Sequence, residues 1–238
     1  MTPLLETSAL NVAYGDIQIL WDIHVRIEEG EIVALAGSNG AGKSTLMRTL
    51  VGLLRPRSGE IFFRGRTITR LQSQDRIKLG LSMVPEGREI FYAMTVDENL
   101  RMGAFTRTDA AGVEKDLAWI YELLPILQER RTQYAGTLSG GEQQMCAIAR
   151  ALMANPQLFL VDELSLGLAP VIVDRLTGTI RKIHQERKIS IFLVEQDVQI
   201  AFELARRGYI IETGKIVVED SSENLLKDDK VREAYLGI

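Results

Sequence analysis

Several features that define other classes of protein are scarce in this sequence. It has one cysteine, Cys146, among 238 residues, so it cannot form an internal disulfide, and this fits a reducing compartment. No stretch approaches the roughly 18 consecutive apolar residues of a membrane-spanning helix, and the start, MTPLLETSAL, lacks the basic and apolar segments of a signal peptide. The formal net charge of -4 does not indicate a broad surface for nucleic acid. We therefore expect a cytosolic protein, or one that reaches a membrane only through a partner.

The sequence has the composition and the pattern of an α/β protein. With 46% apolar and 25% charged residues, the chain can bury a core of its own without a metal or a disulfide. Short apolar runs alternate with helix-like sequence and predict buried strands of a parallel sheet at residues 31–36, 81–84, 158–161 and 190–194. Antiparallel strands are predicted in the segments SALNVAYG, IQILWDIHVRIEEG, GEIFFRG and RGYIIETGKIVVE. From about residue 97 to residue 154 helical periodicity replaces the strand pattern, which predicts a helical lobe inserted into the sheet domain.

The segment GSNGAGKST, residues 37–45, has the pattern of a phosphate-binding loop. It satisfies G-x-x-x-x-G-K-[ST] between a predicted strand and a predicted helix. Glycines allow backbone torsions that point successive N–H groups inward, and the helix N-terminus adds partial positive charge. We expect Lys43 to reach the β and γ phosphates and the Ser44 hydroxyl to ligate Mg²⁺. The predicted ligand is therefore a nucleoside triphosphate.

Two adjacent acids end the apolar run LFLVDE, residues 158–163. Carboxylates at the end of a buried strand are costly unless a cation or a proton transfer uses them. Beside a phosphate-binding loop, Asp162 is expected to hold Mg²⁺ through water. Glu163 would face the other way if the strand continues, and it is expected to polarise the water that attacks the γ phosphate. The alternative is a pair of solvated residues at a strand end.

A third motif, LSGGEQQ at residues 138–144, completes a family pattern. The motifs GSNGAGKST, LSGGEQQ and LFLVDE, in this order and spacing, resemble the nucleotide-binding domain of an ABC transporter over essentially the whole chain. Further segments resemble one branch, the second ATPase subunit of bacterial branched-chain amino-acid importers: VPEGREIF, DENLRMGAF, SLGLAP, FLVEQ and VREAYLG. The resemblance implies an α/β P-loop NTPase core with a mostly parallel sheet, an N-terminal antiparallel β subdomain and an inserted α-helical subdomain. It implies one domain over residues 1–238, with the RecA-like core and antiparallel β part at about 1–96 and 155–238 and the helical subdomain at about 97–154.

The resemblance also implies a site that is shared between two subunits. In the family, the signature motif of one subunit closes over the ATP bound by another subunit. The ATP of the partner subunit would therefore be contacted by Ser139, Gly140, Gly141 and Glu142 of this chain. ATP bound by the chain's own loop would be contacted by Gly37, Ser38, Asn39, Gly40, Ala41, Gly42, Lys43, Ser44 and Thr45. Tyr14 matches the position of the aromatic residue that stacks on adenine.

Three positions depart from the general family pattern. Glu86 stands at the glutamine loop, where a carboxylate should face Mg²⁺ or water because direct contact with phosphate would be repulsive. Gln196 stands at the switch histidine and can donate an amide hydrogen to the γ phosphate, so we assign it a catalytic role. Leu164 replaces the proline after Glu163, which predicts a less rigid loop SLGLA. We predict that Leu164→Pro raises the ATPase rate or leaves it unchanged.

The function implied by this branch is ATP hydrolysis that powers import of branched-chain or related amino acids. The implied partners are ATP, transmembrane permease subunits, a paralogous ATPase subunit or a second copy, and indirectly an extracytoplasmic solute-binding protein, with no nucleic acid. The implied location is peripheral, on the cytoplasmic face of the inner membrane. Transmission of the ATP-driven motion to the permease would involve the segment near Glu86. Arg88, Phe91 and Tyr92 are candidates for contacts with the permease, although packing of the lobe against the sheet explains each of these three residues equally well. Two alternatives are a soluble non-transport ABC-type ATPase and a nucleotide-dependent interaction module with low turnover.

Overall fold

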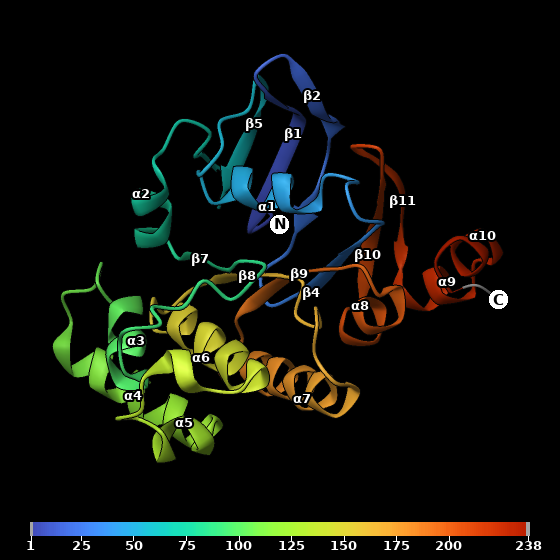
Figure 1. Cartoon of the computed structure of the whole chain (residues 1–238). Coiled ribbons are helices and arrows are strands. Elements are labelled where there is room, and N and C mark those ends of the chain that lie inside the picture. Colours follow the sequence, from blue (N-terminus) through green and yellow to red (C-terminus); the bar gives the residue numbers. More distant parts are fainter. Residues whose placement is uncertain (1, 237–238) are drawn as a thin grey trace.

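The computed structural model describes residues 2–236, which form two β-sheets and the helices that cover them (Figure 1). Met1 and residues 237–238, which the expected single domain includes, lie outside the described residues. In Figure 1 the smaller sheet lies at the top, the larger sheet crosses the middle, and most of the helices lie below it.

The larger sheet has six strands in the order β11-β10-β4-β9-β8-β7. Its five parallel strands are β4 (Ile32–Ala36), β7 (Leu81–Val84), β8 (Leu158–Asp162), β9 (Ser190–Glu195) and β10 (Arg207–Glu212). Every residue of β4, β8 and β9 is buried, as the continuous apolar runs predict. The strand β11 (Lys215–Ser221) pairs antiparallel with β10 at the edge. The prediction of antiparallel strands for RGYIIETGKIVVE is confirmed by this pair, and β10 in addition joins β4 in parallel, which the sequence pattern did not predict.

The smaller sheet is antiparallel and lies at the N-terminal end of the chain. Its strands are β1 (Leu5–Tyr14), β2 (Ile17–Ile23), β3 (Arg26–Ile27), β5 (Ser58–Phe63) and β6 (Arg66–Thr67). The segment IQILWDIHVRIEEG does not form one continuous strand. It divides into β2 and β3, and Asp22 adopts a positive φ of 50° near the break.

Helices cover both faces of the larger sheet. The helix α1 (Lys43–Leu50) lies between the two sheets, and its buried apolar residues, Leu46, Met47 and Leu50, belong to the core that joins them. The other face is covered by α6 (Gly140–Leu152), α7 (Pro170–Arg187) and α8 (Val198–Leu204). The remaining elements are α2 (Ser73–Lys78), α3 (Val96–Gly103), α4 (Ala110–Leu123), α5 (Pro125–Glu129), η1 (Ala135–Thr137), α9 (Ser222–Lys227), α10 (Asp229–Val231) and η2 (Arg232–Leu236). Within residues 2–236, no helix combines the length and the apolarity needed to cross a membrane.

The parallel strands place their carboxyl ends at one edge of the sheet. β4, β8 and β9 are neighbours, so the loops that follow Ala36, Asp162 and Glu195 emerge side by side. Ligands of open α/β sheets bind at this edge. The fold therefore brings the predicted phosphate loop, the acidic pair and the segment containing Gln196 together.

Candidate nucleotide-binding site

The loop between β4 and α1 requires glycine at two positions. A Cβ on Gly37 would lie 2.4 Å from the carbonyl oxygen of Ile211, and a Cβ on Gly42 would lie 2.6 Å from the side chain of Leu20. Gly42 also adopts φ 107°, a torsion that residues with a side chain rarely adopt. No acidic residue lies in the first turn of α1, so the partial positive charge of the helix N-terminus is not compensated there. The loop is therefore shaped to receive an anion.

Lys43 and Glu163 face each other at this loop. The Lys43 Nζ lies 3.3 Å from the Glu163 Oε1, and both side chains are almost fully buried. Lys43 also donates hydrogen bonds to the carbonyl oxygens of Gly37 at 2.9 Å and Ser38 at 3.2 Å. The ammonium group is thus held over the loop by three oxygen partners, one of which is an anion.

Glu163 reaches Lys43 because the chain turns immediately after β8. Alternate facing of Glu163 is conditional on the strand continuing, and that condition is not met: β8 ends at Asp162, and Glu163 adopts φ 52°. A left-handed torsion is costly for a residue with a side chain, and such strain collects at functional sites. The Glu163 N–H donates to the carbonyl oxygen of Val194 on β9 at 2.9 Å, which fixes the turn.

The residues around Asp162 fit a hard divalent cation. The Asp162 Oδ1 is buried and has no hydrogen-bond partner among the described residues. Burial raises the pKa of the Asp162 carboxyl to about 6; a hydrogen bond from Ser44 opposes this shift, and the charges of Glu163 and Glu86 add to it. An unpaired buried carboxylate oxygen beside a hydroxyl and a second carboxylate is a suitable donor set for Mg²⁺. Ser44, Asp162 and Glu86 are therefore the residues that would hold the ion.

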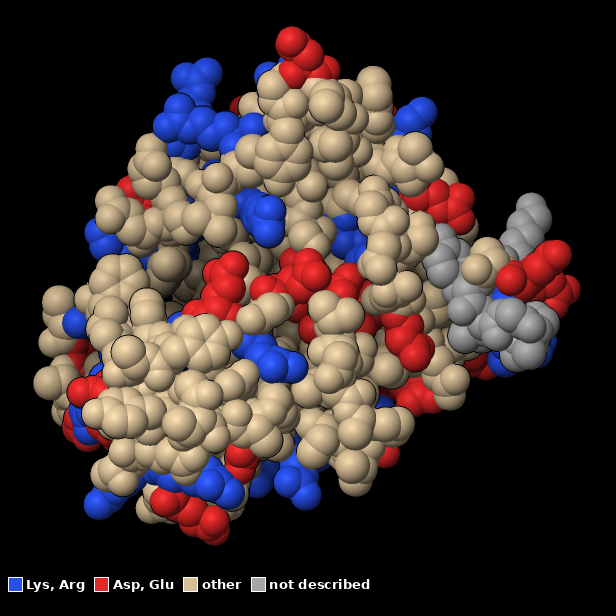
Figure 2. All heavy atoms as spheres, in the orientation of Figure 1, with Lys and Arg blue, Asp and Glu red and all other residues tan. Residues whose placement is uncertain are grey.

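A hollow of about 440 Å³ lies over the loop and gathers most of the predicted contacts. Its lining includes Asn39, Gly40, Gly42, Lys43, Ser44, Thr45, Glu86 and Glu163. Ile19 and Leu166 also line it, and neither was predicted from the sequence. Figure 2 shows a group of acidic side chains at the centre of the face that it draws; in the same orientation, Figure 1 has the smaller sheet above and most of the helices below.

Several predicted contacts lie beside this hollow. Gly37, Ser38 and Ala41 belong to the loop but not to the lining of the hollow. Gln196 follows β9 and lines a second hollow, which shares Glu163 and Leu166 with the first. Tyr14 is the last residue of β1 and is 43% exposed, so its ring is free to contact a ligand but does not line the hollow as the protein stands.

The signature residues open the helix α6 at a different place. Ser139 is the N-cap, with its Oγ accepting from the Glu142 N–H at 3.4 Å, and Glu142 Oε2 accepts from the Ser139 N–H at 2.8 Å. This capping box satisfies two N–H groups at the start of the helix. Ser139 is exposed, and a Cβ on Gly141 would lie 2.8 Å from Ile172. In the described part of the chain, Ser139, Gly140, Gly141 and Glu142 do not line the hollow over the phosphate loop.

The segment after β7 is held against α6 by two arginines. The Arg88 Nη1 donates to the Gln143 Oε1 at 3.2 Å, and Arg88 adopts φ 71°. The Arg150 Nη1 donates to the carbonyl oxygen of Glu89 at 2.8 Å, and its guanidinium lies 5.1 Å from the ring centre of Phe91. Arg88 lies two residues after Glu86, so the segment that brings Glu86 to the hollow is also attached to α6.

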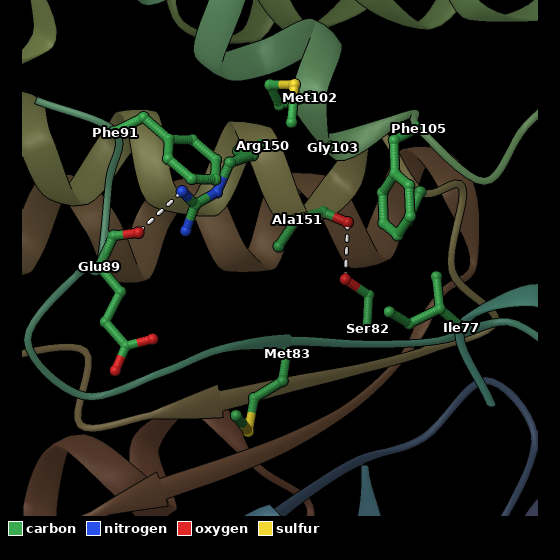
Figure 3. A pocket seen from close by; sticks show the side chains of 11 residues that line it. Ile77, Ser82, Met83, Glu89, Phe91, Met102, Gly103, Phe105, Arg150 and Ala151 are labelled. Atoms are coloured by element: carbon green, nitrogen blue, oxygen red, sulfur yellow. Dashed lines mark hydrogen bonds between the residues drawn. The ribbon is translucent and has the colours of Figure 1, made fainter. Parts of the chain in front are cut away.

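An apolar groove of about 460 Å³ lies next to this segment (Figure 3). We use this name for the hollow lined by Ile77, Ser82, Met83, Glu89, Phe91, Met102, Gly103, Phe105, Arg150, Ala151 and Ala154. Phe91 and Phe105 stand on opposite sides of it, and Ser82 donates to the carbonyl oxygen of Ala151 at its floor at 2.8 Å. Phe105 is 66% exposed, so the groove presents apolar surface to the outside. Of the three candidates for coupling, Phe91 lines the groove, whereas Arg88 and Tyr92 do not.

Comparisons with known proteins agree with this geometry. The sequence profile of the ABC transporter family matches residues 20–165. The chain is 46% identical over 234 residues to the high-affinity branched-chain amino acid transport ATP-binding protein BraG of Pseudomonas aeruginosa, covering 98% of this chain and 100% of that protein. It is 35% identical to the probable branched-chain amino acid transport ATP-binding protein LivF of Archaeoglobus fulgidus, with 99% of each chain covered.

A solved structure has the same fold. The ADP conformation of MJ1267, an ATP-binding cassette of an ABC transporter, matches with a TM-score of 0.86 and 25% identity, and the match covers 100% of both chains. The fold class predicted from the sequence is therefore confirmed, including the mixed sheets and the antiparallel N-terminal part.

Proposed function

The chain belongs to the ABC transporter family of ATP-hydrolysing subunits, and from this premise we propose that it powers the import of branched-chain or related amino acids through separate permease subunits. The observation that carries this proposal is the full-length similarity to two subunits named for branched-chain amino acid transport, one bacterial and one archaeal. The geometry supports the ATPase part, because a lysine, the buried carboxylate of Glu163 and a glycine loop meet at one hollow.

In the proposed reaction, Lys43 and Glu163 separate, and each binds a new partner. An oxygen of the γ phosphate would replace the Glu163 carboxylate as the anion beside the Lys43 Nζ, now 3.3 Å from Glu163. The released Glu163 carboxylate would accept a proton from the water that attacks the γ phosphorus, while the bond to the bridging oxygen breaks. The amide of Gln196, in the adjoining hollow, would donate to the same phosphate.

Ser44, Asp162 and Glu86 would hold Mg²⁺ at the site. When bound, the ion neutralises charge on the β and γ phosphate oxygens. The unpaired oxygen of Asp162 would gain such a partner, because an ionised carboxylate oxygen without a hydrogen bond is costly in a buried place.

The second half of the site is proposed to come from another subunit. Ser139 is exposed at the start of α6, outside the lining of the hollow that holds Lys43. We assign Ser139, Gly140, Gly141 and Glu142 to the ATP of a partner ATPase, either a paralogue or a second copy. Because the γ phosphate would contact both subunits, ATP favours the closed pair and hydrolysis removes the contact.

The permease is proposed to bind at the apolar groove. The groove lies between the sheet core and residues 97–154, which we propose to be the helical subdomain, and Phe91 and Phe105 expose apolar surface there. Arg88 and Arg150 connect its rim to α6, so movement of a bound permease segment would reach the signature residues. We therefore propose that the protein is peripheral at the cytoplasmic face of the membrane, and that the solute-binding protein acts indirectly through the permease.

The proposal is tested by solute uptake. In cells that lack this chain, uptake of radiolabelled leucine, isoleucine and valine should be lost, restored by the wild-type chain, and not restored by Glu163→Gln. Purification from detergent-solubilised membranes should recover integral membrane subunits with the chain. Unchanged uptake of all three amino acids in the deleted cells would overturn the choice of solute, and failure to recover any integral membrane subunit with the chain would support the non-transport alternative.

A further inference from the structure

Glu195 is a buried acid at the nucleotide edge of the sheet for which the proposed reaction has no role. It is the last residue of β9, and its exposed fraction is 1%. Its backbone pairs with Ala36, the last residue of the strand that precedes the phosphate loop. The side chain lines the hollow that also contains Glu163 and Gln196. A carboxyl group in this position needs hydrogen-bond partners.

Both oxygens of the Glu195 carboxyl group are occupied by Ser165. The Ser165 N–H donates to the Glu195 Oε1 at 3.0 Å, and the Ser165 Oγ donates to the Glu195 Oε2 at 2.9 Å. Two donors of one residue thus bind two acceptors of another, which fixes orientation as well as distance. These contacts join the loop after β8 to the end of β9.

The loop that Ser165 belongs to begins at the strained residue Glu163. Leu164 follows it in place of the family's proline, and its side chain is fully buried in the hydrophobic core. The structure therefore contains two restraints that the sequence-based expectation of a less rigid loop does not include: the Leu164 side chain and the Ser165–Glu195 contact. Strained torsions persist only where surrounding contacts determine them.

We infer that Glu195 is a positioning residue for ATP hydrolysis, which holds the loop carrying Glu163 by binding the N–H and the hydroxyl of Ser165. This inference rests on the proposed role of Glu163 as the base. The Glu195 carboxyl group does not touch the substrate in this role. It keeps the turn at Glu163 closed against β9, so that the carboxylate stays directed at the phosphate loop. A displacement of about 1 Å at a reacting group can lower a rate by about 100-fold.

The test uses four substitutions in the full-length chain. Glu195→Ala removes both acceptors, and Ser165→Ala removes the hydroxyl. Two conservative variants keep the hydrogen bonds: Ser165→Thr retains the hydroxyl, and in Glu195→Gln the amide oxygen can accept from the N–H while the amide NH₂ donates to the hydroxyl. A matched control is Ser190→Ala, which removes an acceptor for the Gly30 N–H at the opposite end of the same strand.

We expect Glu195→Ala and Ser165→Ala to lower kcat for ATP hydrolysis by about 10-fold or more while the KM for ATP changes less than about twofold. Glu195→Gln, Ser165→Thr and Ser190→Ala should stay within about threefold of the wild-type kcat. Unfolding temperatures measured in parallel identify any variant that fails to fold. If Glu195→Ala does not fold, the comparison of Ser165→Ala with Ser165→Thr decides the question.

Three results would overturn the inference. These are wild-type kcat in both alanine variants, a kcat in Glu195→Gln as low as in Glu195→Ala, or equal losses in Ser165→Thr and Ser165→Ala. Glu163→Gln is measured in the same assay. If it is inactive while both alanine variants are fully active, only the positioning role fails; if it hydrolyses ATP at the wild-type rate, the assignment of the base fails.

Discussion

The Lys43 ammonium group and the Glu163 carboxylate form a buried ion pair, with 3.3 Å between Nζ and Oε1. Lys43 is the predicted phosphate ligand and Glu163 is the predicted base. Here the two groups pair with each other, and ATP would separate them. A buried pair of this kind resists the loss of one partner, because the remaining charge is left uncompensated. ATP supplies the replacement anion for Lys43, which links nucleotide binding to the release of the base.

Glu163→Gln should abolish turnover and retain ATP binding. The amide cannot accept the proton from water, and general-base catalysis is worth about 100-fold to 10,000-fold. The variant also removes the anion that competes for Lys43, so we expect ATP to bind at least as tightly as to the wild type. Phosphate release measures the first effect, and size-exclusion chromatography with ATP should show accumulation of a dimer.

The control for that variant is Glu31→Gln. Glu31 forms a partly buried ion pair with Arg207 at 2.8 Å, and it precedes β4 at the end of the strand away from the phosphate loop. Loss of this pair should affect stability without lowering the turnover of folded protein by more than about twofold. Wild-type hydrolysis in Glu163→Gln would show that another group activates the water.

Ser139→Arg should abolish turnover by damaging the half-site offered to another subunit. Ser139 lies outside the lining of the hollow over Lys43, so binding of a fluorescent ATP analogue should stay within about twofold of the wild type. The change also removes a helix N-cap, which costs about 1 kcal/mol of stability. Ser221→Arg removes a comparable cap from α9, where the Asn224 N–H donates to the Ser221 Oγ, and it should leave turnover intact. Full turnover in Ser139→Arg would contradict a shared site.

Phe105→Asp should uncouple ATP hydrolysis from transport. Phe105 is 66% exposed in the apolar groove, and a carboxylate there would have to be desolvated under the proposed permease segment. We expect solute uptake by the assembled transporter to fall by about 10-fold or more, with the ATPase rate of the isolated chain within about twofold. Val217→Asp is the control, because Val217 is 50% exposed on β11, outside the groove lining. Normal uptake in Phe105→Asp would remove the groove as the docking site.

Local sequence was sufficient for the parts of the site that depend on neighbours in the chain. The glycine spacing of GSNGAGKST predicts the loop because each glycine requirement is visible in the motif, and LFLVDE predicts the position of Asp162 at a strand end. The turn at Glu163 was not predictable in the same way. It depends on Val194, whose carbonyl oxygen accepts the Glu163 N–H from a strand about thirty residues later.

Long-range pairing explains the other differences. β10 pairs in parallel with β4, which lies more than 170 residues earlier in the chain. No local pattern in RGYIIETGKIVVE predicts this pairing. Glu195 could have been noticed, since the run SIFLVE ends in an acid as LFLVD does. Its role could not, because Ser165 lies 30 residues earlier and only the fold brings the two together.

The stability of the chain should depend on pH through Glu195. Burial raises the pKa of this carboxyl from its ordinary value of 4.5 to about 7; hydrogen bonds from Ser165 oppose the shift and the charge of Glu163 adds to it. A folded-state pKa above the unfolded-state value means that the folded chain binds more protons. The contribution of Glu195 to stability is therefore fully present below about pH 4.5 and is lost as the pH rises to about 7.

Glu195→Gln has no group to titrate at this position, so it should become more stable relative to the wild type as the pH rises. The change in that difference between pH 4.5 and pH 8 is at most about 3 kcal/mol, at about 1.4 kcal/mol for each unit of pKa difference. Urea denaturation of both proteins at several pH values measures this difference in the free energy of unfolding. The contribution of Asp162 cancels in the difference, because both proteins retain that residue. Ser190→Ala, which loses a hydrogen bond in the same strand without losing an acid, should show no such trend against the wild type. A difference between Glu195→Gln and wild type that is constant from pH 4.5 to pH 8 would mean that Glu195 keeps an ordinary pKa in spite of its burial.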